Sequence, residues 1–321
     1  MTEPRLYSQP FTRSQNPPSI QLFHPPKPSL NTPRRTPQNH SKPLRKLTPL
    51  STPLQSSAAS VREQAAKKHT QEMAMVTTGL VAVASLLLLL AGDASAATLA
   101  LYNKCGETVW PGIQPGAGKE ILARGGLQLL PNRATSIRLP TGWSGRVWGR
   151  QGCRFDAAGR GKCATGDCGG ALYCNGAGGE PPATLAEITL GASAAALDFY
   201  DVSLVDGYNV AIDMRPYHGS GANCLPAGCV SDLNSVCPAG LAVRSGNRVV
   251  GCRSACAAFG SAEYCCTGQF GGPQQCKPTT YSRLFKRACP KAYSYAYDDK
   301  TSILTCAAGT SYVVTFCPHR R

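Results

Sequence analysis

The distribution of cysteine constrains this chain more than any other feature of its sequence. All sixteen cysteines lie between Cys105 and Cys317, and none precedes Cys105. An even number at this density is typical of a disulfide framework, so the sequence predicts eight disulfide bonds. Disulfides form and persist in oxidising compartments, and we therefore expect the protein to be exported from the cell.

Zinc binding is the other use of clustered thiols, and the sequence gives it little support. No Cys-x-x-Cys pair recurs at zinc-finger spacing, and only His218 and His319 follow Cys105. The chain also lacks the GxSxG, HExxH and phosphate-loop patterns of common catalytic sites. We therefore expect neither a metal ion nor an organic cofactor.

The first part of the chain differs in composition from the rest. Residues 1–72 contain no Gly, Cys or Trp, hold 12 of the 25 prolines, and carry 11 Lys+Arg against 3 acidic residues. Proline interrupts helix and sheet hydrogen bonding, and the scattered apolar residues are too few to bury a core, so this segment is predicted to be a disordered extension. Its basic, Ser/Thr/Pro-rich composition also fits an organelle presequence, although its prolines argue against the amphipathic helix that such presequences often use.

Residues 73–96 have the pattern of a secretory signal peptide. A 16-residue apolar run covers 76–91, two lysines lie upstream, and Ala94-Ser95-Ala96 follows. A positive flank, a short apolar centre and a small-residue cleavage site are the three parts of such a signal. A spanning helix needs about 20 apolar residues, so a retained membrane anchor is the less favoured alternative.

A signal peptide normally begins its chain, and Met73 and Met75 stand directly before this one. We therefore expect translation to begin at one of these two methionines. On that hypothesis residues 1–72 lie upstream of the true start.

The predicted mature chain, residues 97–321, is basic. It holds 22 Lys+Arg and 14 Asp+Glu, a net charge of +8. Such a charge attracts a secreted protein to anionic surfaces, including cell walls, microbial membranes and acidic polysaccharides. Export, disulfides and the absence of a Lys/Arg stripe argue against nucleic acid as the partner. We expect a monomer.

The apolar pattern of residues 97–321 is mainly that of β-strands. Short apolar or alternating runs, separated by Gly- and Pro-containing turns, cover 97–102, 136–139, 183–190, 197–205, 208–214 and 311–315. Many short strands predict a β-sandwich or barrel. A helix is expected at 251–259, ended by Gly260. Residues 224–289 hold more than half of the cysteines and little strand pattern, which predicts a looped lobe held by cross-links.

Several motifs resemble those of the thaumatin-like protein family. The segment GRGKCATGDC at 159–168, followed by Cys174, is similar to the signature of that family. TVWPG at 108–112, GRVWGR at 145–150, PPATLAE at 181–187, DFYDVSLVDG at 198–207 and CPKAYSY at 289–295 extend the match. The resemblance covers residues 97–321 and implies a flattened β-sandwich core, a disulfide-rich and partly helical lobe, and a small third lobe.

The resemblance also implies how the cysteines pair, which spacing alone leaves open. Adjacent Cys265 and Cys266 would be strained if they were bonded to each other. The family pattern implies the pairs Cys105–Cys317, Cys153–Cys163, Cys168–Cys174, Cys224–Cys306, Cys229–Cys289, Cys237–Cys252, Cys256–Cys265 and Cys266–Cys276.

The family carries an arginine and four acids along a cleft between the sandwich and the lobe. By motif these positions are Arg146, Glu187, Asp201 and Asp206, with Asp298 favoured over Asp299 for the last acid. Clustered acids raise each other's pKa and a nearby guanidinium opposes the rise, so such a site suits cations, sugar hydroxyls or acid/base chemistry. The alternative is structural: a salt bridge for Arg146, a turn for Asp206, and buried ion pairs or turns for the others.

Other candidate residues favour structure over chemistry. Asp167 is expected to fix the loop between Cys168 and Cys174. Tyr293, Tyr295 and Tyr297 would place three rings on one face if their segment is extended, where they would stack on sugars; packing within the protein is the favoured alternative.

The resemblance implies three functions, in order of preference. The first is a secreted antifungal defence protein of plant type that binds β-1,3-glucan, another cell-wall polysaccharide, or the fungal membrane or surface. The second is a weak endo-β-1,3-glucanase that uses Glu187 and Asp201 as its two carboxyl groups. The third is an inhibitor of foreign hydrolases, for which no inserting loop is recognisable in the sequence.

Overall fold

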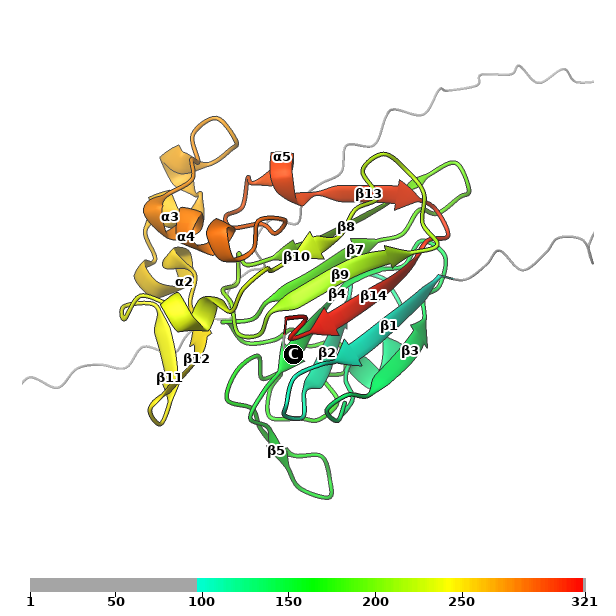
Figure 1. The fold of residues 1–321 in the computed structure, drawn as a ribbon, viewed down its shortest axis with the longest axis horizontal. Helices are drawn as coiled ribbons and strands as arrows, with labels where there is room; N and C mark the ends of the chain where they lie inside the picture. The colour runs from blue at the N-terminus through cyan, green and yellow to red at the C-terminus, as the bar shows by residue number, and fades with distance from the viewer. Residues whose placement is uncertain (1–96, 320–321) are drawn as a thin grey trace, which may run out of the picture. The chain divides into compact units, whose positions relative to one another are not determined.

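The computed structural model describes residues 97–319 of the chain (Figure 1). The expectations for the extension at 1–72 and the signal peptide at 73–96 lie outside the described residues. Within residues 97–319, no helix is long and apolar enough to cross a membrane.

Two five-stranded sheets form the body of the protein (Figure 1). The first has the order β10-β9-β14-β1-β3 and the second the order β13-β8-β7-β4-β2. The strands of the first are β1 (Thr98–Asn103), β3 (Ala134–Arg138), β9 (Ile212–Tyr217), β10 (Ala227–Gly228) and β14 (Ser311–Phe316). Those of the second are β2 (Trp110–Pro115), β4 (Ser144–Arg150), β7 (Leu185–Thr189), β8 (Leu197–Ser203) and β13 (Leu304–Ala307). All neighbours are antiparallel except β1 and β14, which are parallel.

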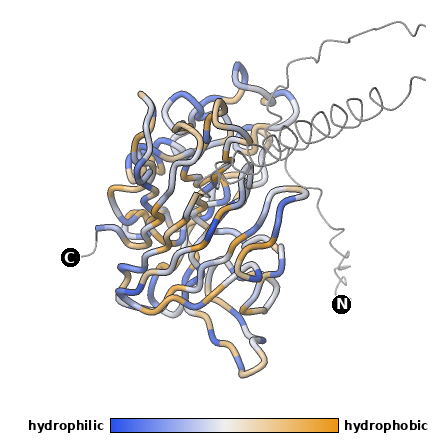
Figure 2. The backbone as a smooth tube through the Cα atoms, turned by 90° about the vertical axis from the view of Figure 1, so that its right-hand side faces the viewer, coloured by the Kyte–Doolittle hydropathy of each residue, from blue (hydrophilic) through white to orange (hydrophobic). Residues whose placement is uncertain are grey.

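The two sheets share one core because their strands alternate inward and outward residues. Every second residue of β1 and of β14 is buried, and hydrophobic and hydrophilic residues intersperse along the strands (Figure 2). Tyr200 of β8 and Tyr312 of β14 meet between the sheets with ring centroids 4.9 Å apart. The structure therefore confirms the predicted mainly β sandwich.

The strand predictions hold best where side chains alternate. The predicted strand at 208–214 begins only at Ile212, and Tyr208 instead forms a bridge with Cys252. Strands β2 and β4 were not predicted because glycine interrupts their pattern. The glycine is required at Gly112, where a Cβ would lie 2.3 Å from the ring of Trp148.

The cross-linked lobe contains the hairpin β11 (Ala242–Ser245) and β12 (Arg248–Cys252) and the helices α2 (Ala255–Phe259), α3 (Ala262–Cys265) and α4 (Thr280–Ala288). The predicted helix at 251–259 thus starts four residues late. Its first residues belong to β12, and the side chain of Ser254 caps α2 by accepting from the backbone N–H of Ala257 at 3.2 Å. Gly260 ends the helix in the left-handed conformation, as predicted.

The remaining short helices are α5 (Asp299–Ser302), η1 (Leu122–Gly125), η2 (Leu233–Val236) and η3 (Gly268–Phe270).

All sixteen cysteines are joined in disulfides, in the eight pairs that the family resemblance implies. Cys105 and Cys317 tie together the two ends of the described residues. The neighbours Cys265 and Cys266 reach different partners, Cys256 and Cys276. The lobe is therefore ordered by covalent links where apolar surface is scarce.

A third element, the hairpin of β5 (Arg154–Phe155) and β6 (Gly161–Lys162), projects from the sandwich (Figure 1). Cys153 and Cys163 close its base. At its tip, Asp156 Oδ1 accepts from the backbone N–H groups of Ala158 and Arg160 at 2.9 and 2.8 Å. This hairpin corresponds in size to the small third lobe that the family resemblance implies, although no local sequence pattern predicted its two short strands.

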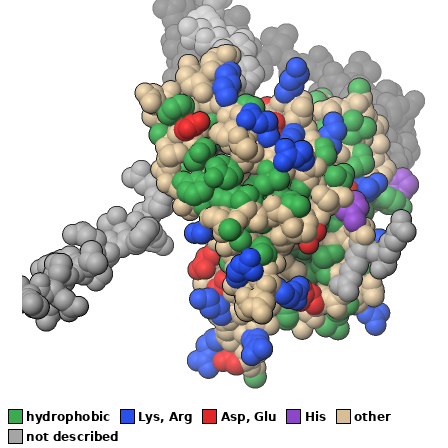
Figure 3. All heavy atoms as spheres, turned by 60° about the vertical axis from the view of Figure 1, so that its left-hand side comes forward, with side chains coloured by type: hydrophobic (Ala, Val, Ile, Leu, Met, Phe, Trp, Pro, Cys, Tyr) green, Lys and Arg blue, Asp and Glu red, His purple; other side chains and the backbone are tan. Residues whose placement is uncertain are grey.

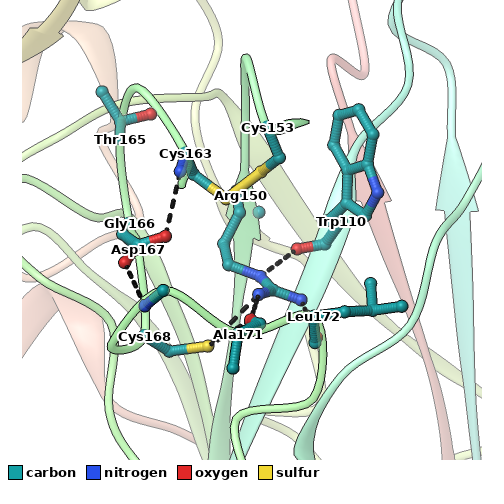
Figure 4. The surroundings of a disulfide bond; sticks show 12 residues. Trp110, Arg150, Cys153, Cys163, Thr165, Gly166, Asp167, Cys168, Ala171 and Leu172 are labelled. Atoms are coloured by element: carbon teal, nitrogen blue, oxygen red, sulfur yellow. Dashed lines mark hydrogen bonds between the residues drawn. A yellow bond between two sulfur atoms is a disulfide. The ribbon is translucent and has the colours of Figure 1, made fainter. Parts of the chain in front are cut away.

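Arg150 organises the signature segment from within (Figure 4). Its side chain is fully buried and donates to the carbonyl oxygens of Trp110, Ala171 and Leu172 at 2.9, 2.8 and 2.7 Å. Burial lowers the pKa of Arg150 to about 10, while the charge of Asp167 opposes the change. A guanidinium has five donors in a rigid fork, which suits this set of convergent carbonyls.

Asp167 has the structural role that its sequence position predicts. Its Oδ1 accepts from the backbone N–H of Cys163 at 2.9 Å and its Oδ2 from that of Gly170 at 2.7 Å. The signature segment therefore folds around one buried guanidinium and one buried carboxylate (Figure 4).

Replacing Arg150 with Met should destabilise the protein by about 3–5 kcal/mol, because several buried carbonyl oxygens lose their donor. For a domain of this size the melting temperature should fall by at least about 6 °C. Differential scanning calorimetry of the oxidised protein measures this change. The matched control is Arg138→Met at an exposed position of β3, which should melt within about 1–2 °C of the wild type; an equally small effect of Arg150→Met would contradict the role of the guanidinium.

Candidate functional site

Three charged side chains lie in a row across the second sheet. Arg146 of β4 stands opposite Glu187 of β7, and Glu187 stands opposite Asp201 of β8. Directly opposed residues of antiparallel strands project from the same face. Arg146 Nε lies 3.2 Å from Glu187 Oε1, so the first two members form an ion pair.

The row occupies the face of the second sheet that points away from the sandwich core. The residues that alternate with it, Val147, Ala186 and Val202, belong to the core between the sheets. On the outer face, Trp148 and Leu185 form a small separate cluster with Ala183 and the Cys168–Cys174 bridge. The charged row therefore lies next to this covered patch, with Arg146 and Glu187 partly exposed to solvent.

Asp201 is the most unusual member of the row. Asp201 is only 9% exposed, and its Oδ1 is buried with no hydrogen-bond partner among the described residues. Burial raises the pKa of Asp201 well above its usual value, the charges of Glu187 and Asp299 raise it further, and Arg146 opposes them. A buried carboxyl oxygen without a donor is costly, and its position beside other acids makes Asp201 a candidate functional residue.

Glu187 is shifted in the same direction for the same first reason. Burial raises its pKa, Arg146 opposes the rise, and Asp206 adds to it. Its side chain keeps 30% exposure and that of Arg146 keeps 42%. The ion pair is thus reachable from solvent, while Asp201 lies deeper.

Asp206 lies in a turn, as one of the two alternatives for it expects, and is also close enough to Arg146 to be affected by its charge. It lies in the turn after β8, where the backbone N–H of Gly207 donates to Leu204 O at 2.9 Å and Gly207 adopts a φ of +91°. Burial raises the pKa of Asp206 and the charge of Arg146 lowers it. The turn thereby brings a third carboxyl group into the electrostatic reach of the row.

The structure brings Asp299, not the favoured Asp298, to this group of acids. Asp298 Oδ2 accepts from Lys286 Nζ and Ser294 Oγ, both at 2.8 Å, so its carboxylate anchors α4 to the following loop. Asp299 Oδ1 instead accepts from the hydroxyl of Tyr293 at 2.9 Å, and its charge acts on Asp201. The sequence could not separate two adjacent aspartates, because the lysine that pairs with Asp298 lies twelve residues earlier in α4, and only the folded chain brings the two together.

Tyr293 completes the group, although sequence reasoning gave it no polar role. Its backbone bonds the end of β8, with N–H donating to Val202 O and C=O accepting from Leu204 N, both at 2.8 Å. The residue is 4% exposed, and burial together with Asp299, Asp201 and Glu187 raises its pKa. The segment with Tyr295 and Tyr297 is made of turns, so the extended row of three rings does not form and Tyr293 packs within the protein.

We call Arg146, Glu187, Asp201, Asp206, Asp299 and Tyr293 the acidic cluster. Its carboxylates accept hydrogen bonds, while Arg146 and any protonated carboxyl donate them. Among residues 97–319, no group of three or more His, Cys, Asp or Glu side chains has the arrangement of a metal site. Two cavities of about 650 and 510 Å³ are lined by other residues.

The protein is a disulfide-rich β-sandwich protein with a cross-linked lobe and several carboxylates on the outer face of one sheet. Residues 103–318 match the profile of the thaumatin family. The chain belongs to this family.

Similar proteins of known family support the assignment to the thaumatin family. A thaumatin-like protein of Arabidopsis thaliana is 67% identical over 236 residues, which are 73% of this chain and 95% of that one. Pathogenesis-related thaumatin-like protein 3.5 of Cryptomeria japonica is 52% identical over 76% of this chain and 99% of that one. Pathogenesis-related protein 5 of Arabidopsis thaliana is 56% identical over 68% of this chain and 89% of that one.

Asp201→Asn should stabilise the protein at neutral pH. The folded pKa of Asp201 is raised, so the carboxyl favours folding while it is protonated, below about pH 4, and this contribution is lost as the pH rises through the folded pKa. We expect the variant to melt about 2–4 °C above the wild type at pH 7, a change of about 1 kcal/mol.

The same comparison at pH 3 should show no advantage for Asp201→Asn. Thermal melts from pH 3 to pH 8 measure the difference. The exposed Glu120 supplies the matched control Glu120→Gln, whose small effect should not vary with pH in this way. A stabilisation by Asp201→Asn that is equal at all pH values would show that Asp201 is not held at a raised pKa.

Proposed function

We propose that this protein is a secreted, antifungal defence protein that binds β-1,3-glucan of the fungal surface through the acidic cluster. The observation that carries the proposal is the row of Arg146, Glu187 and Asp201, in which a buried carboxyl oxygen has no partner among the described residues. The names of two relatives as pathogenesis-related proteins support the defence role. Eight disulfides support an extracellular site of action.

A polyhydroxylated ligand fits the hydrogen-bonding character of this row. A sugar hydroxyl both donates and accepts, so one hydroxyl can donate to a carboxylate while it accepts from the Arg146 guanidinium. Donation to Asp201 Oδ1 would satisfy an oxygen that the described protein leaves unpaired, and removing such a deficit is worth about 1–3 kcal/mol. The exposure of Arg146 and Glu187 leaves them within reach of a polysaccharide chain.

The overall charge complements this local preference. Residues 97–321 carry a net charge of +8, which attracts the protein to an anionic cell surface over distances of about a Debye length. The acidic cluster then acts at contact range on neutral hydroxyl groups. Attraction and recognition are thus assigned to different parts of the molecule.

The double variant Glu187→Ala, Asp201→Ala should bind insoluble β-1,3-glucan more weakly, by about tenfold or more, because two acceptor groups are lost. Co-sedimentation with curdlan particles measures the bound fraction over a range of protein concentrations. Glu120→Ala removes an exposed acid outside the cluster and is the matched control. Binding by the double variant that equals the control would refute recognition through the cluster.

A weak endo-β-1,3-glucanase activity is the second candidate, favoured by the pairing of Glu187 with Asp201. Opposed residues have Cβ atoms about 4.5–5.5 Å apart, compatible with the carboxyl separation of about 5–5.5 Å in retaining glycosidases. The raised pKa of Asp201 suits a general acid; burial also raises the pKa of Glu187, and the ion pair with Arg146 opposes that rise. In this scheme Asp201 protonates the glycosidic oxygen while Glu187 attacks the anomeric carbon and the leaving sugar departs. A water molecule then hydrolyses the glycosyl-enzyme and gives a proton back to Asp201, which frees Glu187.

Release of new reducing ends from laminarin distinguishes catalysis from binding. The glucanase hypothesis expects release by the wild type and at least a hundredfold loss in Glu187→Gln, since an amide cannot act as the nucleophile. Binding to curdlan by the same variant reports that the fold and the ligand contacts persist. If no reducing ends appear with the wild type at high protein concentration, the protein binds glucan without cleaving it.

A further inference from the structure

The cross-linked lobe contains a hollow that is separate from the acidic cluster. It has a volume of about 650 Å³ and is lined by residues of α3, of the loop after it, and of the N-terminal end of α4. Tyr264 and Tyr281 form part of its wall. None of its lining residues belongs to the acidic cluster.

The two tyrosines of the wall form a contiguous group of three rings with Phe259, which does not itself line the hollow. Tyr281 of α4 lies with its ring centroid 5.6 Å from that of Tyr264 of α3, at an interplanar angle of 87°. Phe259 of α2 lies 5.3 Å from Tyr281 and 5.7 Å from Tyr264 and is 47% exposed. The space-filling view of this side of the molecule shows hydrophobic side chains gathered at the surface beside lysines and arginines (Figure 3).

Apart from Phe270 and Pro278, the other residues that line the hollow are polar, and most of them are exposed. Glu263 supplies acceptors, Gln275 supplies both donors and acceptors, and Lys277 and Arg283 supply donors. Arg283 Nη1 donates to Pro278 O at 2.8 Å, which holds the guanidinium at the rim. Among residues 97–319, the hydroxyls of Tyr264 and Tyr281 have no hydrogen-bond partner, so both remain available to a ligand.

Covalent links and a helix cap hold this wall in place before any ligand arrives. Cys256–Cys265 fixes the residue next to Tyr264, and Cys266–Cys276 fixes the residue between Gln275 and Lys277. Thr279 and Ser282 form a capping box that sets the first turn of α4, where Tyr281 lies. A preorganised wall loses little conformational freedom on binding, which favours affinity.

We propose that this hollow is a second carbohydrate-binding site, which takes the pyranose rings of a neutral glucan chain. A β-linked glucose unit has an apolar C–H face, which suits stacking on the partly exposed rings of Tyr264 and Tyr281. It also has a rim of hydroxyls, which suits mixed donors and acceptors. One acid and two bases give the rim a net charge of only +1, which argues against a strongly charged ligand. The site shares its ligand class with the proposed function and none of its residues.

Two sites on one rigid chain would act together on a polysaccharide. A polymer that occupies one site presents further sugar units at high effective concentration to the other, so the avidity exceeds either affinity. A short oligosaccharide that cannot span both sites would lose this gain. The hollow therefore gives the protein a way to prefer intact cell wall over soluble fragments.

The test is a titration of the oxidised protein with laminarihexaose. Binding is measured by isothermal titration calorimetry and by saturation-transfer NMR from the tyrosine ring protons. To isolate the hollow, the titration is repeated in the acidic-cluster variant Glu187→Gln, Asp201→Asn. In that background, Tyr281→Ala and, separately, Gln275→Ala with Arg283→Ala should each weaken the remaining binding about three- to tenfold. Tyr217→Ala removes a tyrosine that is 57% exposed and outside the hollow, and it should change nothing.

The outcomes separate this proposal from the proposed function. Binding that survives in the acidic-cluster variant and falls with the hollow variants, but not with Tyr217→Ala, supports the second site. Complete loss of binding in the acidic-cluster variant, with full binding by hollow variants of the wild type, overturns the hollow and supports the acidic cluster. Because Gln275 and Arg283 are exposed, their replacement keeps the test valid if Tyr281→Ala fails to fold.

Discussion

The register of β7 between β4 and β8 is the constraint on which the acidic cluster depends. Side chains alternate with a period of two along a strand, so a shift of one residue would turn Glu187 into the core and Ala186 out of it. The burial of Val147, Ala186 and Val202 between the sheets prevents such a shift. The hydrophobic core therefore specifies which charged residues meet on the outer face, without any favourable contact among the acids themselves.

The covalent framework supplies what the register cannot. Tyr293 and Asp299 come from a segment far along the chain from β8, and they must be delivered to the end of that strand. Cys229–Cys289 and Cys224–Cys306 bracket this segment and tie it to the region after β9. Each disulfide contributes about 2–4 kcal/mol, which is comparable with the cost of holding a carboxyl such as Asp201 in a buried place. Strain at the site is thus offset by links that lie away from it.

How far the sequence predicted this protein depended on the kind of signal. Cysteine density predicted the cross-linked lobe, and side-chain alternation predicted β1, β8 and β14. Strands β2 and β4 were not predicted because glycine interrupts their alternation of side chains. Glycine is needed there to leave space for Trp148, which is a property of the packed sheet. The start of α2 was missed because Gly251 and Cys252 pair with β11.

The candidate site was predictable to the same degree and for related reasons. Family motifs indicated Arg146, Glu187, Asp201 and Asp206, and the sheet register brings the first three into line. The sequence did not separate Asp298 from Asp299, because Lys286, twelve residues before Asp298, pairs with the carboxylate of Asp298 only in the folded protein. The polar role of Tyr293 depends on its docking beside β8, which no local pattern encodes.

The shifted pKa values give the acidic cluster a chemical character that its composition alone would not suggest. Ionised carboxylates only accept hydrogen bonds, and a protonated carboxyl also donates one. Burial raises the pKa of both Asp201 and Glu187, and Arg146 opposes the rise at each of them. A carboxyl with a raised pKa takes up a proton more readily, and it can then donate a hydrogen bond as well as accept one. For the glucan ligand that we propose, such carboxyls beside a guanidinium fit sugar hydroxyls, which also donate and accept, better than a uniformly ionised set of acids, which would select a cation instead.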